Sequence, residues 1–210
     1  MSDSFVKNKY DLKQLIRLIC GSYAYNLGTE INLSNRKDQQ TFSRFYPRRM
    51  SAEVLLDAVS QTLEVPTAFP GGSGEFPLGT RAIELPDENV AIGFLDVFGR
   101  PARFKACECE RIDTPTLAQG LELVNSKQIQ DKLSSQNGFA HRLASNNRSP
   151  QENCELIFLT LYGRVATTAE LEVAVAHVSR IAMADGSKKD ERYRDLIWAL
   201  LASNEFMFVQ

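Results

Sequence analysis

The sequence predicts a mostly α-helical fold: an irregular multi-helix domain with one long Pro/Gly-rich loop. Three observations support this prediction. Apolar residues recur three and four positions apart in successive segments, which is the period of an amphipathic helix. Ser, Thr or Asp precedes these segments, and Gly or Pro follows them, as at helix ends. Because alternation of apolar and polar residues is brief throughout, we allow at most a short β-hairpin, within residues 75–112.

Two helices are expected before residue 66. Asp11 is placed to cap the first helix, and Gly21 to end it. Ser51 is placed to cap the second, Glu53 adds a favourable negative charge to its first turn, and Pro66 stops it. The apolar face of the first helix consists of Leu12, Leu15, Ile16 and Ile19, and that of the second of Val54, Leu55, Val59 and Leu63.

A long irregular segment follows the second helix. Residues 65–86 contain four prolines and four glycines, which disfavour both a helix and a central strand. We therefore expect a single domain over residues 1–210, with two helical halves, 1–65 and 87–210, joined by the loop 66–86.

Thr-Pro and Ser-Pro pairs mark helix starts in the C-terminal half. In each pair the hydroxyl group accepts hydrogen bonds from first-turn amides, and the proline occupies a position whose N–H would have no helical partner. Gly99 and Gly163 are placed to end two of these helices. The two pairs are Thr114-Pro115 and Ser149-Pro150. Further helix starts are expected at Asp87, Thr168 and Asp190, and shorter helices over 126–135 and 138–145.

The charge balance argues against one class of partner. The formal net charge is −2, whereas nucleic-acid-binding domains are usually basic, so we expect no nucleic acid. Residues 1–50 carry nine basic and four acidic side chains, and residues 51–98 carry one basic and eight acidic. We expect these two segments to face each other in the fold rather than to form a patch for a partner.

The sequence predicts neither a membrane span nor a signal peptide. No apolar run approaches the roughly 18 residues that a membrane-spanning helix needs. The N-terminus, MSDSFVKNKYDLKQL, lacks the apolar core of a signal peptide, so the chain by itself predicts a cytoplasmic protein. Its four cysteines are too few for a disulfide scaffold.

Five short motifs follow one another between residues 80 and 117. In this order they resemble the signature of the planctomycete-specific PSD-one domain, a family of unknown function. Flanking stretches at 46–53, 161–170 and 198–206 resemble helices of the same domain, so the resemblance covers nearly the whole chain. The motifs are Thr80-Arg81-Ala82-Ile83, Leu85-Pro86-Asp87, Phe98-Gly99-Arg100-Pro101, Cys107-Glu108-Cys109-Glu110-Arg111 and Pro115-Thr116-Leu117.

The resemblance implies a place in a larger protein. Members of the family are typically long exported proteins with a haem-c-type domain upstream, which implies export and upstream domains as partners. This chain has no Cys-x-x-Cys-His haem site, and we expect no cofactor. It begins where the family domain would already be inside a helix, so we expect the C-terminal part of a PSD-one-like domain.

The motif block also holds the candidate functional cluster. Zinc needs about four ligands, and a Cys-x-Cys supplies two, so the others would have to come from elsewhere in the chain, from Cys20, Cys154, His141 or His177. We expect Cys20 and Cys154 to be buried packing residues and expect no metal. A structural role for the Cys-x-Cys is favoured over a metal site or a strained redox pair. The cluster consists of Arg81, Arg100, Arg103, Cys107, Glu108, Cys109, Glu110 and Arg111.

Two functions remain open at this point. The first is a non-catalytic helical interaction module that docks the upstream domains, another protein or a polysaccharide. The second is a hydrolase-type enzyme with a carboxylate and arginine site, with or without a metal, around residues 80–111. Its centre would be Glu108, Glu110 and Arg100. The alternative role of the nearby carboxylates is ion pairing with the arginines of the block; these carboxylates are Glu84, Asp87, Glu108 and Glu110. We favour the first, because both histidines lie outside the block and common catalytic motifs are absent.

Overall fold

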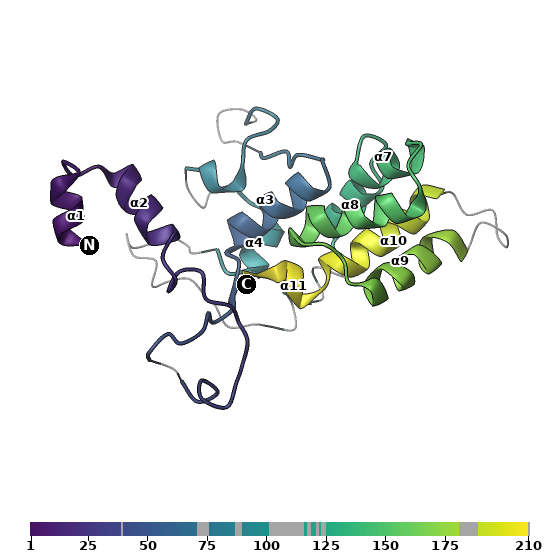
Figure 1. The fold of residues 1–210 in the computed structure, drawn as a ribbon. Helices are drawn as coiled ribbons and strands as arrows, with labels where there is room; N and C mark the ends of the chain where they lie inside the picture. Colours follow the sequence, from purple (N-terminus) through teal and green to yellow (C-terminus); the bar gives the residue numbers. More distant parts are fainter. Residues whose placement is uncertain are drawn as a thin grey trace. The chain divides into compact units, whose positions relative to one another are not determined.

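The structure, a computed structural model of the 210-residue chain, describes residues 1–38, 40–70, 76–86, 90–100, 116, 119–120, 122, 125–180 and 189–209. Their regular structure is almost entirely helical (Figure 1), which confirms the predicted fold class. The chain divides into two compact units, Met1–Arg48 with Phe208–Gln210, and Arg49–Met207. The single-domain organisation with halves 1–65 and 87–210 stays a prediction.

The first unit contains the helices α1 (Ser2–Lys7) and α2 (Leu12–Cys20). Asp11 caps α2 as predicted, since its Oδ1 accepts hydrogen bonds from the backbone N–H groups of Lys13 at 2.9 Å and Gln14 at 3.2 Å. Gly21 ends the helix. No residue of α1 or α2 is buried.

Cys20, at the end of α2, is exposed, so the prediction that it is a buried packing residue is wrong. The physical reason is that helical spacing identifies an apolar face without showing whether anything covers that face. The corresponding prediction for Cys154 is confirmed, because this thiol is buried on α8 (Pro150–Tyr162).

The second unit begins with α3 (Ala52–Thr62), which packs against the short 3₁₀ helix η1 (Ala82–Glu84) and against α4 (Gly93–Val97). The predicted helix start at Asp87 lies outside the described residues. Residues 90–92 are not helical, and α4 begins only after Ile92, which has extended backbone angles. The carbonyl of Val90 accepts a hydrogen bond from the Arg100 guanidinium at 2.8 Å, a tertiary contact in place of a helical one. Gly99, with φ of 81°, ends this segment as predicted.

The long loop predicted over residues 66–86 packs against the core where the structure describes it. Phe69, Ala82 and Leu85 are all buried. The Ser60 and Thr67 hydroxyl groups, which lie 2.9 Å apart, join the loop to α3. The Gly-rich run at 71–74 lies outside the described residues. This loop is therefore held by its apolar side chains rather than acting only as a linker.

The remaining helices of the unit are α6 (Lys127–Leu133), α7 (Phe139–Ser145), α8, α9 (Thr168–Arg180), α10 (Lys189–Leu201) and α11 (Asn204–Met207). The predicted helices at 126–135 and 138–145, and the starts at 149–150, 168 and 190, are confirmed within one or two residues. Ser149 and Glu152 form a reciprocal capping box, and Gly163 ends α8 in the left-handed region with φ of 67°. The predicted start at 114–115 lies outside the described residues.

Helix α10 packs against α7, α8 and α9, and α8 packs against α9, so that α8, α9 and α10 lie side by side (Figure 1). A buried amide joins three of these helices. Asn153 on α8 is fully buried, and its Nδ2 donates to the carbonyl of Leu143 on α7 at 3.2 Å and to the hydroxyl of Tyr193 on α10 at 2.9 Å.

The β structure is small. Two-residue strands, β1 (Arg48–Arg49) and β2 (Phe208–Val209), form a two-stranded sheet. Residues 76–86 and 90–100, the described part of 75–112, contain no strand, and the rest of that range lies outside the description. Within the described chain, no helix is long and apolar enough to cross a membrane.

We predict that Gly163→Ala destabilises the protein by about 1 kcal/mol, because a Cβ atom is strained in the left-handed region. The melting temperature should then fall by roughly 2–4 °C. Gly93→Ala is the matched control: both glycines have open space around the added Cβ, but only Gly163 has a positive φ. Calorimetry that found equal melting temperatures for the two variants would contradict this explanation.

Candidate functional site

Arg81, the first residue of the predicted cluster, lies beside α3. Its side chain is 61% exposed, and its Nε is 3.6 Å from Oδ2 of Asp57. Asp57 also accepts hydrogen bonds from the backbone N–H groups of Ala82 at 2.6 Å and Ile83 at 3.3 Å. The Glu84 carboxylate accepts from the backbone N–H of Arg81 at 2.9 Å. Both carboxylates therefore stabilise the start of η1.

Arg100 also has a structural role. Its guanidinium donates to the Val90 carbonyl and to Oδ1 of Asp96, each at 2.8 Å. Arg81 thus pairs with Asp57, which lies outside the motif block, and Arg100 pairs with Asp96, four residues before it. The rest of the cluster, namely Arg103, Cys107, Glu108, Cys109, Glu110 and Arg111, lies outside the described residues, as does Asp87, so the cluster stays a prediction.

The described part of the chain contains no group of three or more His, Cys, Asp and Glu side chains that could hold a metal ion. Burial raises the pKa of the Cys154 thiol to about 11, so this thiol stays protonated at neutral pH. His141 is exposed on α7. His177 differs from these residues, because it lines a groove.

This groove lies among α8, α9 and α10 and has a volume of about 560 Å³. Its lining is mostly apolar, with Phe158 and Ala174 buried and Val173 72% exposed. It combines a concave apolar surface with a few polar side chains, which is the usual character of a binding site. The described lining residues are Phe158 and Tyr162 of α8, Ala169, Glu170, Val173, Ala174 and His177 of α9, Asp195, Leu196, Ala199 and Leu200 of α10, and Glu205 of α11.

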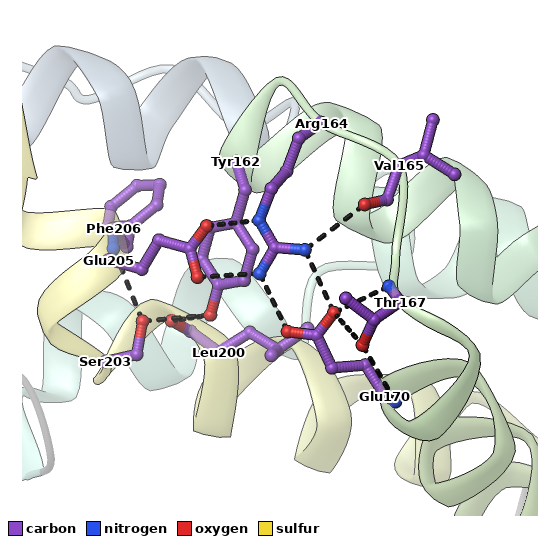
Figure 2. Close-up of polar contacts among 9 residues, drawn as sticks. All are labelled: Tyr162, Arg164, Val165, Thr167, Glu170, Leu200, Ser203, Glu205 and Phe206. Carbon is purple, nitrogen blue, oxygen red and sulfur yellow. Dashed lines mark hydrogen bonds and ion pairs between the residues drawn. The ribbon is translucent and has the colours of Figure 1, made fainter. Parts of the chain in front are cut away.

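A single arginine organises one side of the groove (Figure 2). Arg164 donates to Glu205 through Nε at 2.6 Å and through Nη2 at 2.9 Å. The same guanidinium donates to Glu170 through Nη1 at 2.9 Å and through Nη2 at 2.7 Å. Since Glu170 belongs to α9 and Glu205 to α11, Arg164 joins the first turns of two helices.

Glu170 also closes the start of α9. Its Oε2 accepts from the backbone N–H of Thr167 at 2.7 Å and from the Thr167 hydroxyl at 2.8 Å. The hydrogen bonds from Arg164, followed by those from Thr167, lower the pKa of Glu170 to about 2. The carboxylate is therefore ionised at every physiological pH.

Tyr162 holds the end of α10. Its hydroxyl group donates to the Leu200 carbonyl at 3.1 Å and lies 2.9 Å from the Ser203 hydroxyl (Figure 2). Burial raises the pKa of Tyr162, which keeps this donor protonated. The polar groups at this side of the groove are thus already paired with one another.

Two polar groups of the lining are not paired in this way. The Nε2 atom of His177 is buried and has no hydrogen-bond partner. The Asp195 carboxylate is exposed and has no ion-pair or hydrogen-bond partner among the described residues, unlike its neighbour Arg194, which pairs with Asp190 and Glu191. Both can still engage a ligand.

The sequence carries a partial signal of this groove. The apolar residues of α10 have helical spacing, and Leu196 and Leu200 remain half-buried where Tyr193, Ile197 and Leu201 are buried. Thr167 and Glu170 have the spacing of a capping box. The pairing of Arg164 with Glu205 carries no such signal, because 41 residues separate the two.

We predict that Arg164→Lys lowers the free energy of unfolding by about 1–2 kcal/mol, because lysine keeps the charge but cannot bind two carboxylates in a bidentate manner. Arg142→Lys is the matched control, since Arg142 binds a single exposed carboxylate, that of Glu64. Its cost should stay below about 1 kcal/mol. Urea unfolding checks both values, and equal losses would contradict the special role of Arg164.

The lowered pKa of Glu170 also predicts a pH dependence. Its ordinary value is 4.5, so the stabilisation is complete above about pH 4.5 and is lost as the pH falls toward 2. Glu170→Gln should therefore be less stable than the native protein at pH 7 and lose less stability between pH 5 and pH 2. Glu172→Gln, an exposed residue of the same helix, should follow the native curve. Parallel curves for the native protein and Glu170→Gln would show the prediction to be wrong.

The chain was compared with known proteins. No curated protein and no solved structure matches it. Residues 1–178 match a family model, PSD1, described as a protein of unknown function (DUF1553). The match ends before α10 and α11, so the resemblance noted at 198–206 stays a prediction. Because the match spans well over half of its 210 residues, this chain belongs to the PSD1 family.

Proposed function

We propose that this chain is a non-catalytic helical interaction module that binds a segment of a partner protein in the groove of α8, α9 and α10. The observation that carries the proposal is the groove itself, which leaves Val173 72% exposed beside half-buried Leu196 and Leu200. Covering such a surface with apolar side chains of a partner removes it from water, which favours association.

The partner we propose is a protein segment. A polysaccharide would place hydroxyl groups against an aliphatic lining, where few groups could accept or donate their hydrogen bonds. Family resemblance adds that the partner belongs to upstream domains of a larger exported protein of the planctomycete type. This context is part of the proposal.

The chemistry of the described carboxylates supports binding over catalysis. A general acid at neutral pH needs a raised pKa. The pKa values of Glu152 and Glu170 are lowered instead. Glu152 accepts hydrogen bonds from Ser149, and Glu170 accepts them from Arg164 and then from Thr167. Asp57 is committed to η1 and Arg81. These carboxylates therefore stabilise helix starts and ion pairs in their ionised form.

The alternative function, a hydrolase-type enzyme around residues 80–111, has one observation in its favour. A cavity of about 310 Å³ lies beside Arg81, and its lining includes the polar residues Asp57, Glu64 and Thr80. However, Asp57 caps η1 and Glu64 binds Arg142, so neither carboxylate is available for acid–base work. We therefore rank this function second.

The proposal is tested with a phage library of random 16-residue peptides, selected on the full chain. We predict that enriched peptides bind Val173→Asp at least tenfold more weakly, because the new carboxylate must be desolvated in the complex. Leu78→Asp is the matched control, since Leu78 is 75% exposed and lies outside the groove.

Circular dichroism verifies that both variants keep the native helix content. Peptides that bind the native protein and Val173→Asp equally would overturn the proposal, as would a library in which no clone is enriched.

A further inference from the structure

We infer that the groove of α8, α9 and α10 binds a basic amphipathic α-helix. This inference rests on the proposed function and adds the secondary structure and charge of the bound segment. Three features of the groove support it: its elongated shape, the charge of its lining, and one unsatisfied polar atom.

The first feature is the shape. The walls are α9 and α10, each 13 residues and thus about 20 Å long. Lining positions recur along α9 at 169, 173 and 177, and along α10 at 195–196 and 199–200. This repeat of about four residues follows one face of each helix, so the groove runs along the helices as a trough. A helix fits such a trough through side chains at i, i+3, i+4 and i+7.

Small side chains at the walls allow that approach. The lining combines the small Ala169 and Ala199 with the larger Val173 and Leu196, one turn away on the same helices, and buried Phe158 adds an aromatic side chain. Where small and large residues alternate, the side-chain ridge of a second helix can pack into the spaces above the small residues. A continuous row of large side chains would keep that helix at a greater distance. The volume of about 560 Å³ accommodates several aliphatic side chains of such a helix.

The second feature is the charge. The described lining contains three carboxylates, those of Glu170, Asp195 and Glu205, and no lysine or arginine. Arg164 offsets only one of the two charges of Glu170 and Glu205, to which it is bound. Asp195 keeps its full charge at the rim. The net charge around the groove is therefore negative, and lysine or arginine residues flanking the apolar face of a partner helix would complement it.

The third feature is His177. Its Nε2 atom is buried without a hydrogen-bond partner, although it lies in the wall of the groove. An unsatisfied buried polar atom destabilises the free protein, and a ligand group that bonds to it recovers that loss. A lysine or arginine N–H of the partner can donate to an imidazole nitrogen that carries no proton, once the ring turns that nitrogen toward the groove. The same kind of basic side chain can therefore pair with Asp195 and donate a hydrogen bond to His177.

The test uses two synthetic 18-residue peptides with the same leucine face, spaced i, i+3, i+4 and i+7. One carries lysine at all flanking positions and the other glutamate, and a scrambled lysine peptide controls for amphipathic order. Fluorescence anisotropy measures their binding to the full chain at low and moderate salt. We expect the lysine peptide to bind at least tenfold more tightly than the glutamate and scrambled peptides.

Two variants locate the effect. Asp195→Lys should weaken binding of the lysine peptide about tenfold and improve that of the glutamate peptide. Asp131→Lys, the same charge change at an exposed position of α6 outside the groove, should leave both affinities unchanged. His177→Phe should weaken the lysine peptide several-fold and leave the glutamate peptide unaffected.

The outcomes separate this inference from the proposed function. If both peptides bind equally and Val173→Asp abolishes both, the groove is an interaction site but the charge inference is wrong. If neither peptide binds although library peptides do, the inference of a basic helix is wrong and the proposed function stands. Lysine-peptide binding that ignores Asp195→Lys would be non-specific attraction, and it would overturn the inference.

Discussion

The arrangement of the C-terminal helices depends on one guanidinium group. Gly163 turns the chain sharply at the end of α8, and the next residue, Arg164, then binds Glu170 of α9 and Glu205 of α11 at once. Arginine suits this position because its planar donors match two carboxylates in bidentate geometry. The first turns of α9 and α11 are therefore held at a defined distance from the end of α8, and with them the side of the groove that Glu170 and Glu205 line.

A second polar contact fixes the other end of α8. Asn153 donates to both Leu143 of α7 and Tyr193 of α10, in a site from which water is excluded. Such a network is stable only when each member keeps its partner, so it favours one register of the three helices. With α8 held at both ends, the walls of the groove are in place before a ligand arrives. Binding to a preorganised surface loses less conformational entropy than binding to a mobile one.

The density of Arg, Glu and Cys between residues 80 and 111 made that block the candidate site at the level of sequence. The described residues of the block stabilise the fold. Arg81 binds Asp57, and the Arg100 guanidinium donates to the Val90 carbonyl beside α4. Arg100 pairs with the nearby Asp96, but the partner of the Arg81 side chain is distant in the sequence. Asp57 lies 25 residues from Ala82, whose N–H it accepts. The groove, in contrast, has a mostly apolar lining, and its few polar residues form no motif in the sequence.

Features that depend on neighbours within about four residues were determined by the sequence alone. The caps at Asp11 and Ser149 and the left-handed end at Gly163 are of this kind, because their hydrogen bonds and backbone angles are local. The exposure of Cys20, the late start of α4 and the pairing of Arg164 with Glu205 were decided only by the tertiary structure. Each of these three features depends on contacts with residues that are distant in the sequence. The groove belongs to this second group, since periodicity shows that Leu196 and Leu200 lie on the apolar side of α10 but not that they remain half-buried in the folded chain.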